Sequence, residues 1–321
     1  MIASAGPSLL RNGELIGRRL GFSSSWAGLV MIATVTSLPE LATGISAVTV
    51  AGNPDIALGD VMGSLMFNLL IFALIDVLCR DQPLYRILEP GHVLSAAFGI
   101  VLIGVAAAFM LLGERIPPLW KTHIGVYSLI LPILYFISVR SISKREHAPV
   151  GNQTSDLAGQ PMQYGGWQLL RNYSVAAAIV VAAGIWLPLV AEQLATRMEW
   201  HSSFVGTTFV AAATSLPELI VTIAAIRMGN PNIAAANLLG SNLFDILIIA
   251  ADDAAFTGGP ILSHISPAHI FSALVAIVMT ALIIAGLSYR PQLRLLNAMS
   301  WVGFCLIATY LLGSYLVYTY P

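Results

Sequence analysis

The pentapeptide Thr36-Ser37-Leu38-Pro39-Glu40 occurs twice in this chain, the second time as Thr214-Ser215-Leu216-Pro217-Glu218. Each copy lies inside an otherwise apolar run. Proline has no amide hydrogen and clashes with the preceding helical turn, so we expect Pro39 to free backbone carbonyls near Ala33 and Val35. These carbonyls, two hydroxyls and a carboxylate would lie within about two turns of helix, and oxygen atoms of this kind are preferred by hard cations. The stretch therefore predicts a cation-binding site.

The composition predicts an integral membrane protein. Of the 321 residues, 57% are hydrophobic and only 10% are charged, and the mean hydropathy is +0.81. Ordinary soluble domains carry about 25% charged residues. Residues 93–112, 268–288 and 295–320 contain no charge, and each range has the roughly 20 residues that cross a bilayer. Cys79 and Cys305 lie far apart in apolar surroundings and predict no disulfide framework.

We predict an all-α fold with ten membrane-spanning helices. Their expected ranges are 2–10, 24–50, 56–79, 91–112, 123–139, 173–194, 201–226, 233–251, 268–288 and 295–320. The first range is short, and we interpret it as the second half of a helix whose first half is missing. The expected organisation is a first five-helix repeat, a hydrophilic linker and a second five-helix repeat, at residues 1–139, 140–171 and 172–321.

The two five-helix segments resemble each other in sequence. Glu218 follows Glu40 by 178 residues, and after one deletion the offset is 177. The second offset pairs Gly52-Asn53-Pro54 with Gly229-Asn230-Pro231, Gly63-Ser64 with Gly240-Ser241, and Asn68 with Asp245. Because each segment holds an odd number of spans, the second must insert upside down relative to the first. Inverted repeats of this kind are typical of secondary transporters, which bind substrate near the membrane midplane where the repeats meet.

Basic residues predict the orientation. If the linker at 140–171 is cytoplasmic, eleven Lys and Arg residues lie on the cytoplasmic side and three outside. This bias follows the positive-inside rule and puts both termini outside. We therefore expect a multi-pass protein of the cell (inner) membrane.

Four predicted helices carry polar side chains four residues apart, which places each pair on one helix face. The pairs are Thr36 with Glu40, Ser64 with Asn68, Thr214 with Glu218, and Ser241 with Asp245. A carboxylate at the bilayer centre is costly unless it is paired, protonated or bound to a cation, and no intramembrane Lys or Arg is available to neutralise these. Oxygen ligands without thiolate or imidazole favour Ca²⁺, Mg²⁺ or Na⁺ over zinc or copper.

Each of these four pairs forms a polar stripe on its helix. The glycines and acidic residues outside the stripes are interpreted separately. Gly59 and Gly63 predict a close helix contact. Asp76, Asp252 and Asp253 lie beyond the polar stripes. They are interpreted either as solvated ends of spans or as an accessory ion site at an entrance, and both readings stay open.

The blocks at 33–68 and 211–245 resemble the paired α-repeats of the sodium/calcium exchanger family, in the cation/calcium antiporter superfamily. The resemblance extends to the ten-span layout and implies an antiporter that moves Na⁺ and Ca²⁺ in opposite directions by alternating access, not an enzyme, with no cofactor. One departure is Leu65, which stands where the family has asparagine. Carried over residue by residue, the resemblance implies ion ligands at Ala33 and Ala211 (backbone carbonyls), Thr36, Ser37, Glu40, Ser64, Asn68, Thr214, Ser215, Glu218, Ser241 and Asp245.

Two alternatives stay open. Proton- or K⁺-coupled exchangers of the same superfamily are one; the proton-coupled relatives usually carry a Gly-Asn-Ala-x-Glu motif where this chain has Thr-Ser-Leu-Pro-Glu. A non-exchanging cation channel is the other. The expected partners are the lipid bilayer and inorganic cations, with no nucleic acid, and the pattern leaves stoichiometry and oligomeric state open.

Overall fold

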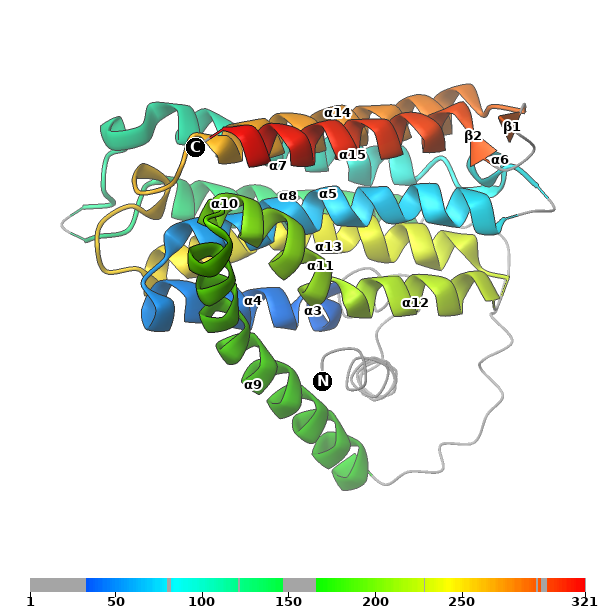
Figure 1. Ribbon diagram of the computed structural model, residues 1–321. Coiled ribbons are helices and arrows are strands. Elements are labelled where there is room, and N and C mark those ends of the chain that lie inside the picture. The colour runs from blue at the N-terminus through cyan, green and yellow to red at the C-terminus, as the bar shows by residue number, and fades with distance from the viewer. Residues whose placement is uncertain are drawn as a thin grey trace.

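The computed structural model describes residues 33–79, 82–120, 122–146, 166–227, 229–292, 294–295 and 299–320. These residues form a bundle of helices (Figure 1). The helices are α3 (Ala33–Thr36), α4 (Leu38–Ser46), η2 (Ala47–Ala51), α5 (Pro54–Leu78), α6 (Leu84–Ile87), α7 (His92–Leu112), η3 (Gly113–Arg115), α8 (Tyr127–Glu146), α9 (Gly166–Met198), α10 (Ser202–Val205), η5 (Gly206–Val210), α11 (Ala211–Thr214), α12 (Leu216–Arg227), α13 (Pro231–Ala255), η6 (Ile261–Ser263), α14 (Ala268–Tyr289) and α15 (Trp301–Thr319).

Five of these helices are long and apolar enough to cross a membrane: α5, α7, α13, α14 and α15. A sixth span is formed if the segment ending at Thr214 and the one starting at Leu216, which are bent by 44° relative to each other, are counted together. α8 and α9 coincide with two further predicted spans, and the predicted span at 2–10 lies outside the described residues. The total of ten and the inverted arrangement of the halves stay predictions.

Helix bounds in the structure differ from two of the predicted ranges. α8 continues to Glu146 and α9 begins at Gly166, so helical structure extends into both ends of the predicted linker at 140–171. The last predicted span, 295–320, begins instead with two short antiparallel strands, β1 (Arg294–Leu295) and β2 (Met299–Ser300). α15 starts after them because the Ser300 side chain accepts a hydrogen bond from the Gly303 amide, as N-cap residues do.

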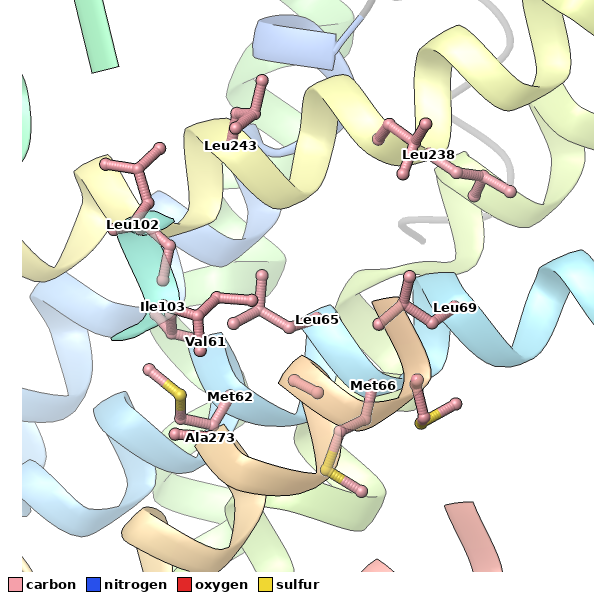
Figure 2. Close-up of a cluster of buried hydrophobic side chains, with 14 of the residues drawn as sticks. Val61, Met62, Leu65, Met66, Leu69, Leu102, Ile103, Leu238, Leu243 and Ala273 are labelled. Carbon is pink, nitrogen blue, oxygen red and sulfur yellow. The ribbon is translucent and has the colours of Figure 1, made fainter. Parts of the chain in front are cut away.

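α5 and α13 form the centre of the bundle. In the most apolar stretch of each, 72% of the residues are buried, against 28% for α15. Figure 2 shows Val61, Met62 and Leu65 of α5 in this core with residues of other helices, among them Leu102 and Leu243. α9 runs obliquely to the other helices (Figure 1). A side chain placed near the middle of α5 or α13 is therefore surrounded by protein.

Small residues bring α5 against the segment that precedes the second pentapeptide, as predicted. A Cβ atom added to Gly63 would lie 2.2 Å from the Thr207 carbonyl oxygen, and one added to Gly59 would lie 2.8 Å from Gly206 Cα. These distances leave no room for a side chain. The two glycines thus place the neighbouring Ser64 next to the helices of the other half.

Contacts between the halves come in reciprocal pairs. Near the start of α5, Asp55 accepts hydrogen bonds from the Ser266 amide at 2.6 Å and from His269 Nε2 at 3.0 Å. The residues that the 177-residue offset pairs with these three make the same contacts. Near the start of α13, Asn232 Oδ1 lies 2.8 Å from the Glu89 amide and 3.1 Å from His92 Nε2. Reciprocal contacts of this kind are expected for two halves related by a two-fold axis.

Candidate functional site

Both pentapeptides interrupt a helix at the serine. Ser37 separates α3 from α4 with φ −87° and ψ 11°, and Ser215 separates α11 from α12 with φ −80° and ψ 11°. The near-identical angles show that the two copies adopt one local structure. In each copy the proline occupies the first turn of the following helix, where its missing amide hydrogen is tolerated.

The expectation that Pro39 frees the Ala33 carbonyl is wrong. The Ala33 oxygen accepts the Ser37 amide at 3.0 Å and the Thr36 hydroxyl at 3.1 Å. The physical reason is register, because in an α-helix the amide missing at residue 39 would have bonded to residue 35. The Ala211 oxygen is engaged in the same way, by the Ser215 amide at 3.0 Å and the Thr214 hydroxyl at 3.1 Å.

Each of the two glutamates accepts a hydrogen bond from a serine of the other half. Ser37 Oγ lies 3.4 Å from Glu218 Oε1, and Ser215 Oγ lies 3.1 Å from Glu40 Oε1. Each serine therefore contacts the glutamate of the other pentapeptide. These contacts bring α4 and α12 together at one polar cluster inside the bundle.

Hydroxyl groups from α5 and α13 complete the contacts of this cluster. Ser64 Oγ lies 3.0 Å from Ser215 Oγ. On the other side, Ser241 Oγ lies 3.3 Å from Glu218 Oε1 and 3.3 Å from the Thr36 hydroxyl. The polar stripes predicted on four helices thus meet.

The next turns of α5 and α13 add an amide and a carboxylate. Asn68 Nδ2 donates to Asn242 Oδ1 at 3.0 Å. Asn242 Nδ2 in turn donates to the Leu65 carbonyl at 3.3 Å, while the Leu65 side chain is buried in the apolar core. Neither carboxylate oxygen of Asp245 has a hydrogen-bond partner. The sequence did not predict Asn242 as a site residue, although Leu65, which occupies the equivalent position in the first half, was noted as a departure from the family.

All twelve predicted site residues are buried, with exposed fractions of 2% or less. Ten of them contribute side chains to the cluster or to its margin, and two contribute backbone carbonyls that are already bonded. They are Ala33, Thr36, Ser37, Glu40, Ser64, Asn68, Ala211, Thr214, Ser215, Glu218, Ser241 and Asp245.

One acid of the site was missed by the sequence interpretation. Asp60 of α5 is fully buried, and its Oδ1 accepts the Thr214 hydroxyl at 2.7 Å. Two signals could have identified it: Asp60 precedes Ser64 by four residues and so shares its helix face, and the 177-residue offset pairs it with the polar Asn237.

Unpartnered oxygen atoms are concentrated in this cluster. Glu40 Oε2, Glu218 Oε2, Asp60 Oδ2, Asn68 Oδ1 and both carboxylate oxygens of Asp245 are buried without a hydrogen-bond partner. The four carboxyl groups also interact electrostatically with one another. Buried charges without partners are strongly unfavourable, so a cation in the cluster would be stabilised.

The acids beyond the cluster are not solvated, which corrects one of the two predicted readings. Asp76, Asp252 and Asp253 are all fully buried. Asp253 accepts hydrogen bonds from the Gly125 and Ile261 amides, both at 2.7 Å, and from the Tyr127 hydroxyl at 2.6 Å. Its counterpart Asp76 accepts the Ser300 amide at 2.6 Å. Both acids therefore hold the start of another segment in place.

Oxygen atoms are the ligands that this cluster offers to a cation. Within the described ranges, no three carboxylate, imidazole or thiolate groups are placed to hold one metal ion together. A bound cation would therefore combine carboxylates with hydroxyl, amide or carbonyl oxygens, a mixture suited to Ca²⁺ or Na⁺.

The chain is similar in sequence to known proteins. The inner membrane protein YrbG of Escherichia coli is 25% identical over 261 residues, which cover 77% of this chain and 74% of YrbG. The sodium/calcium exchanger MaX1 of Methanosarcina acetivorans is 28% identical over 278 residues, covering 75% of each chain.

The fold is similar to that of a solved exchanger. A structure of the sodium-calcium exchanger NCX_Mj, soaked with 10 mM Na⁺ and 10 mM Sr²⁺, matches with a TM-score of 0.63 at 22% identity, over 97% of this chain and 93% of the other. The family described as "Sodium/calcium exchanger protein" matches residues 1–142 and 173–319. This multi-pass cell-membrane protein therefore belongs to the sodium/calcium exchanger family of cation/Ca²⁺ antiporters.

Proposed function

We propose that the protein exchanges Na⁺ for Ca²⁺ at the polar cluster around Glu40 and Glu218, by alternating access. The observation that carries this proposal is the pair of crossed contacts, Ser37 with Glu218 and Ser215 with Glu40. They bring a carboxylate from each half into one buried cluster, where the second oxygen of each glutamate lacks a hydrogen-bond partner.

The coupling follows from electrostatics. One Ca²⁺, or more than one Na⁺, would neutralise the same buried carboxylates, and both kinds of ion cannot do so together. Ser64 and Ser241 would supply neutral oxygens beside the glutamates. One turn further along, Asn68 would supply a neutral amide oxygen and Asp245 a carboxylate. The Ala33 and Ala211 carbonyls would join only if the Thr36 and Thr214 hydroxyls gave up their hydrogen bonds to them.

Uptake of ⁴⁵Ca²⁺ into sealed proteoliposomes, under an imposed Na⁺, K⁺ or H⁺ gradient, tests the coupling ion. We expect the Na⁺ gradient alone to drive accumulation. Accumulation with the H⁺ or K⁺ gradient, and none with Na⁺, would establish the coupled alternative. Ca²⁺ flux without any counter-ion would identify a channel.

Glutamate variants test the site. We expect Glu40→Gln and Glu218→Gln each to abolish Na⁺-driven uptake, because each removes one of the two crossed carboxylates. Glu199→Gln, which changes an exposed carboxylate, should transport like the unchanged protein. Near-normal uptake in both glutamine variants of the cluster would reject this site.

A further inference from the structure

Asp60 and Thr214 form a hydrogen bond that the duplication does not explain. Thr214 Oγ1 lies 2.7 Å from Asp60 Oδ1, and both side chains are fully buried. The two offsets of the duplication pair these residues with Asn237 and Thr36. Asn237 is also buried, but among the described residues neither polar atom of its side chain has a hydrogen-bond partner. The two halves thus share the threonine and differ in the residue that faces it.

The Thr214 hydroxyl lies near more acceptors than it can serve. Besides Asp60, the Ala211 oxygen lies 3.1 Å away and the Val210 oxygen 3.2 Å away. A hydroxyl group donates only one hydrogen. The shortest of the three contacts is to a carboxylate, and hydrogen bonds to a charged acceptor are stronger than neutral ones. The carboxylate of Asp60 therefore takes the hydrogen, and the two carbonyl oxygens do not.

This choice leaves oxygen lone pairs open beside the central cluster. A carbonyl oxygen has two lone pairs, and the Ser215 amide occupies one of those of Ala211 at 3.0 Å. When the Thr214 hydrogen points to Asp60, the second lone pair of Ala211 and those of the hydroxyl itself stay open. Both residues lie next to the cluster, because Ser215 follows Thr214 in the chain and its hydroxyl lies 3.0 Å from Ser64.

We propose that Asp60 is a positioning residue: by accepting the Thr214 hydrogen, it makes the Thr214 hydroxyl and the Ala211 carbonyl available to the transported cation. This inference rests on the proposed function, since it assumes that cations bind at the central cluster. Ca²⁺ takes six to eight oxygen ligands, so two further oxygens are a substantial part of its shell. The equivalent position in the second half carries no acid, and there the Thr36 hydroxyl donates to the Ala33 oxygen at 3.1 Å.

A double-mutant cycle on Ca²⁺ affinity tests this role. Equilibrium binding of ⁴⁵Ca²⁺ to the purified full chain, without Na⁺, is measured for the unchanged protein, Asp60→Asn, Thr214→Val and the double variant. We expect Asp60→Asn alone to raise the dissociation constant at least about tenfold, because a charged acceptor is lost. The increase should be at least about fivefold smaller in the Thr214→Val background, where no hydroxyl is left to position. Any direct effect of the Asp60 charge on the ion occurs in both backgrounds and cancels in this ratio.

Further variants separate positioning from a structural role. In a Thr214→Ser background, which keeps the hydroxyl, Asp60→Asn should again weaken binding about tenfold. The equivalent pair, Asn237→Ala and Thr36→Val, should change the dissociation constant independently, because Asn237 has no hydrogen bond to Thr36. Melting temperatures without Ca²⁺ report the structural effect of each change. A contact that only stabilises the fold would show coupling in the melting temperature and none in the dissociation constants.

The failures of the two proposals are distinguishable. Equal fold-changes for Asp60→Asn with and without the Thr214 hydroxyl would overturn this inference, as would unchanged Ca²⁺ affinity in Asp60→Asn, while the central cluster would stand. If Asp60→Asn does not melt cooperatively, Asp60→Ala replaces it in the cycle with the same two expectations. If the unchanged protein binds no Ca²⁺, the central site of the proposed function is rejected, and this inference with it.

Discussion

The two halves of the central cluster are alike at the glutamates and different one turn away. Ser37 and Ser215 make the same contact with the opposite glutamate, at 3.4 and 3.1 Å. The neighbouring threonines differ, because Thr214 donates to Asp60 while Thr36 contacts Ser241. Duplication thus supplies the common frame of the site, and a few unpaired substitutions supply its asymmetry.

The asymmetry concerns where charge is placed. The first half has Asp60 and Asn68, and the second has Asn237 and Asp245 at the equivalent positions. Each half therefore carries one acid and one amide on its central helix, in opposite order. Asn237 shows the difference plainly, since both polar atoms of its buried side chain lack partners, whereas Asp60 is bonded to Thr214.

Among the positions where the halves differ, the largest effect is expected from moving the charge of Asp245. Asp245→Asn should slow Na⁺-driven ⁴⁵Ca²⁺ uptake by at least about tenfold, which corresponds to about 1.4 kcal/mol, because a cation would lose one carboxylate. The double variant Asn68→Asp with Asp245→Asn restores the charge on α5 and should recover part of the rate. A double variant as slow as the single one would show that the charge must lie on α13.

A smaller effect is expected at the paired structural acids. Asp253→Asn should lower the free energy of unfolding by about 3 kcal/mol, because its amide NH₂ would face donors on either side. Asp76→Asn should cost less than about 1 kcal/mol, since one oxygen of Asp76 has no partner and could be replaced. Thermal unfolding in detergent measures both, and equal losses would contradict the difference in bonding.

The smallest effect is expected at the reciprocal contacts between the halves. Asp55→Asn should change stability by less than about 1 kcal/mol, because Asn232 already makes the equivalent contacts with Glu89 and His92. The melting temperature of the variant is the measurement. A large decrease would mean that the charge of Asp55, and not its hydrogen-bond geometry, holds His269.

Much of the site could be predicted from local pattern. The pentapeptides, the i and i+4 pairs and the 177-residue offset place ten side chains on four helix faces, and the structure brings these faces together. The prediction for the Ala33 carbonyl failed because it ignored helical register. Asp60 was missed although it shares a helix face with Ser64 and pairs with Asn237 at the 177-residue offset; its contact with Thr214 comes from packing between the halves.

The sequence by itself determined the membrane class, the duplication and the family, because these depend on hydrophobic length and on residues repeated at fixed spacing. Tertiary structure decided which acids are bonded and which are not. Asp252 and Asp253 are neighbours in the chain, yet Asp253 meets the Gly125 and Ile261 amides while Asp252 meets the bare backbone of Gly44. Adjacent residues on a helix point in different directions, so their partners come from different helices and only packing could assign them.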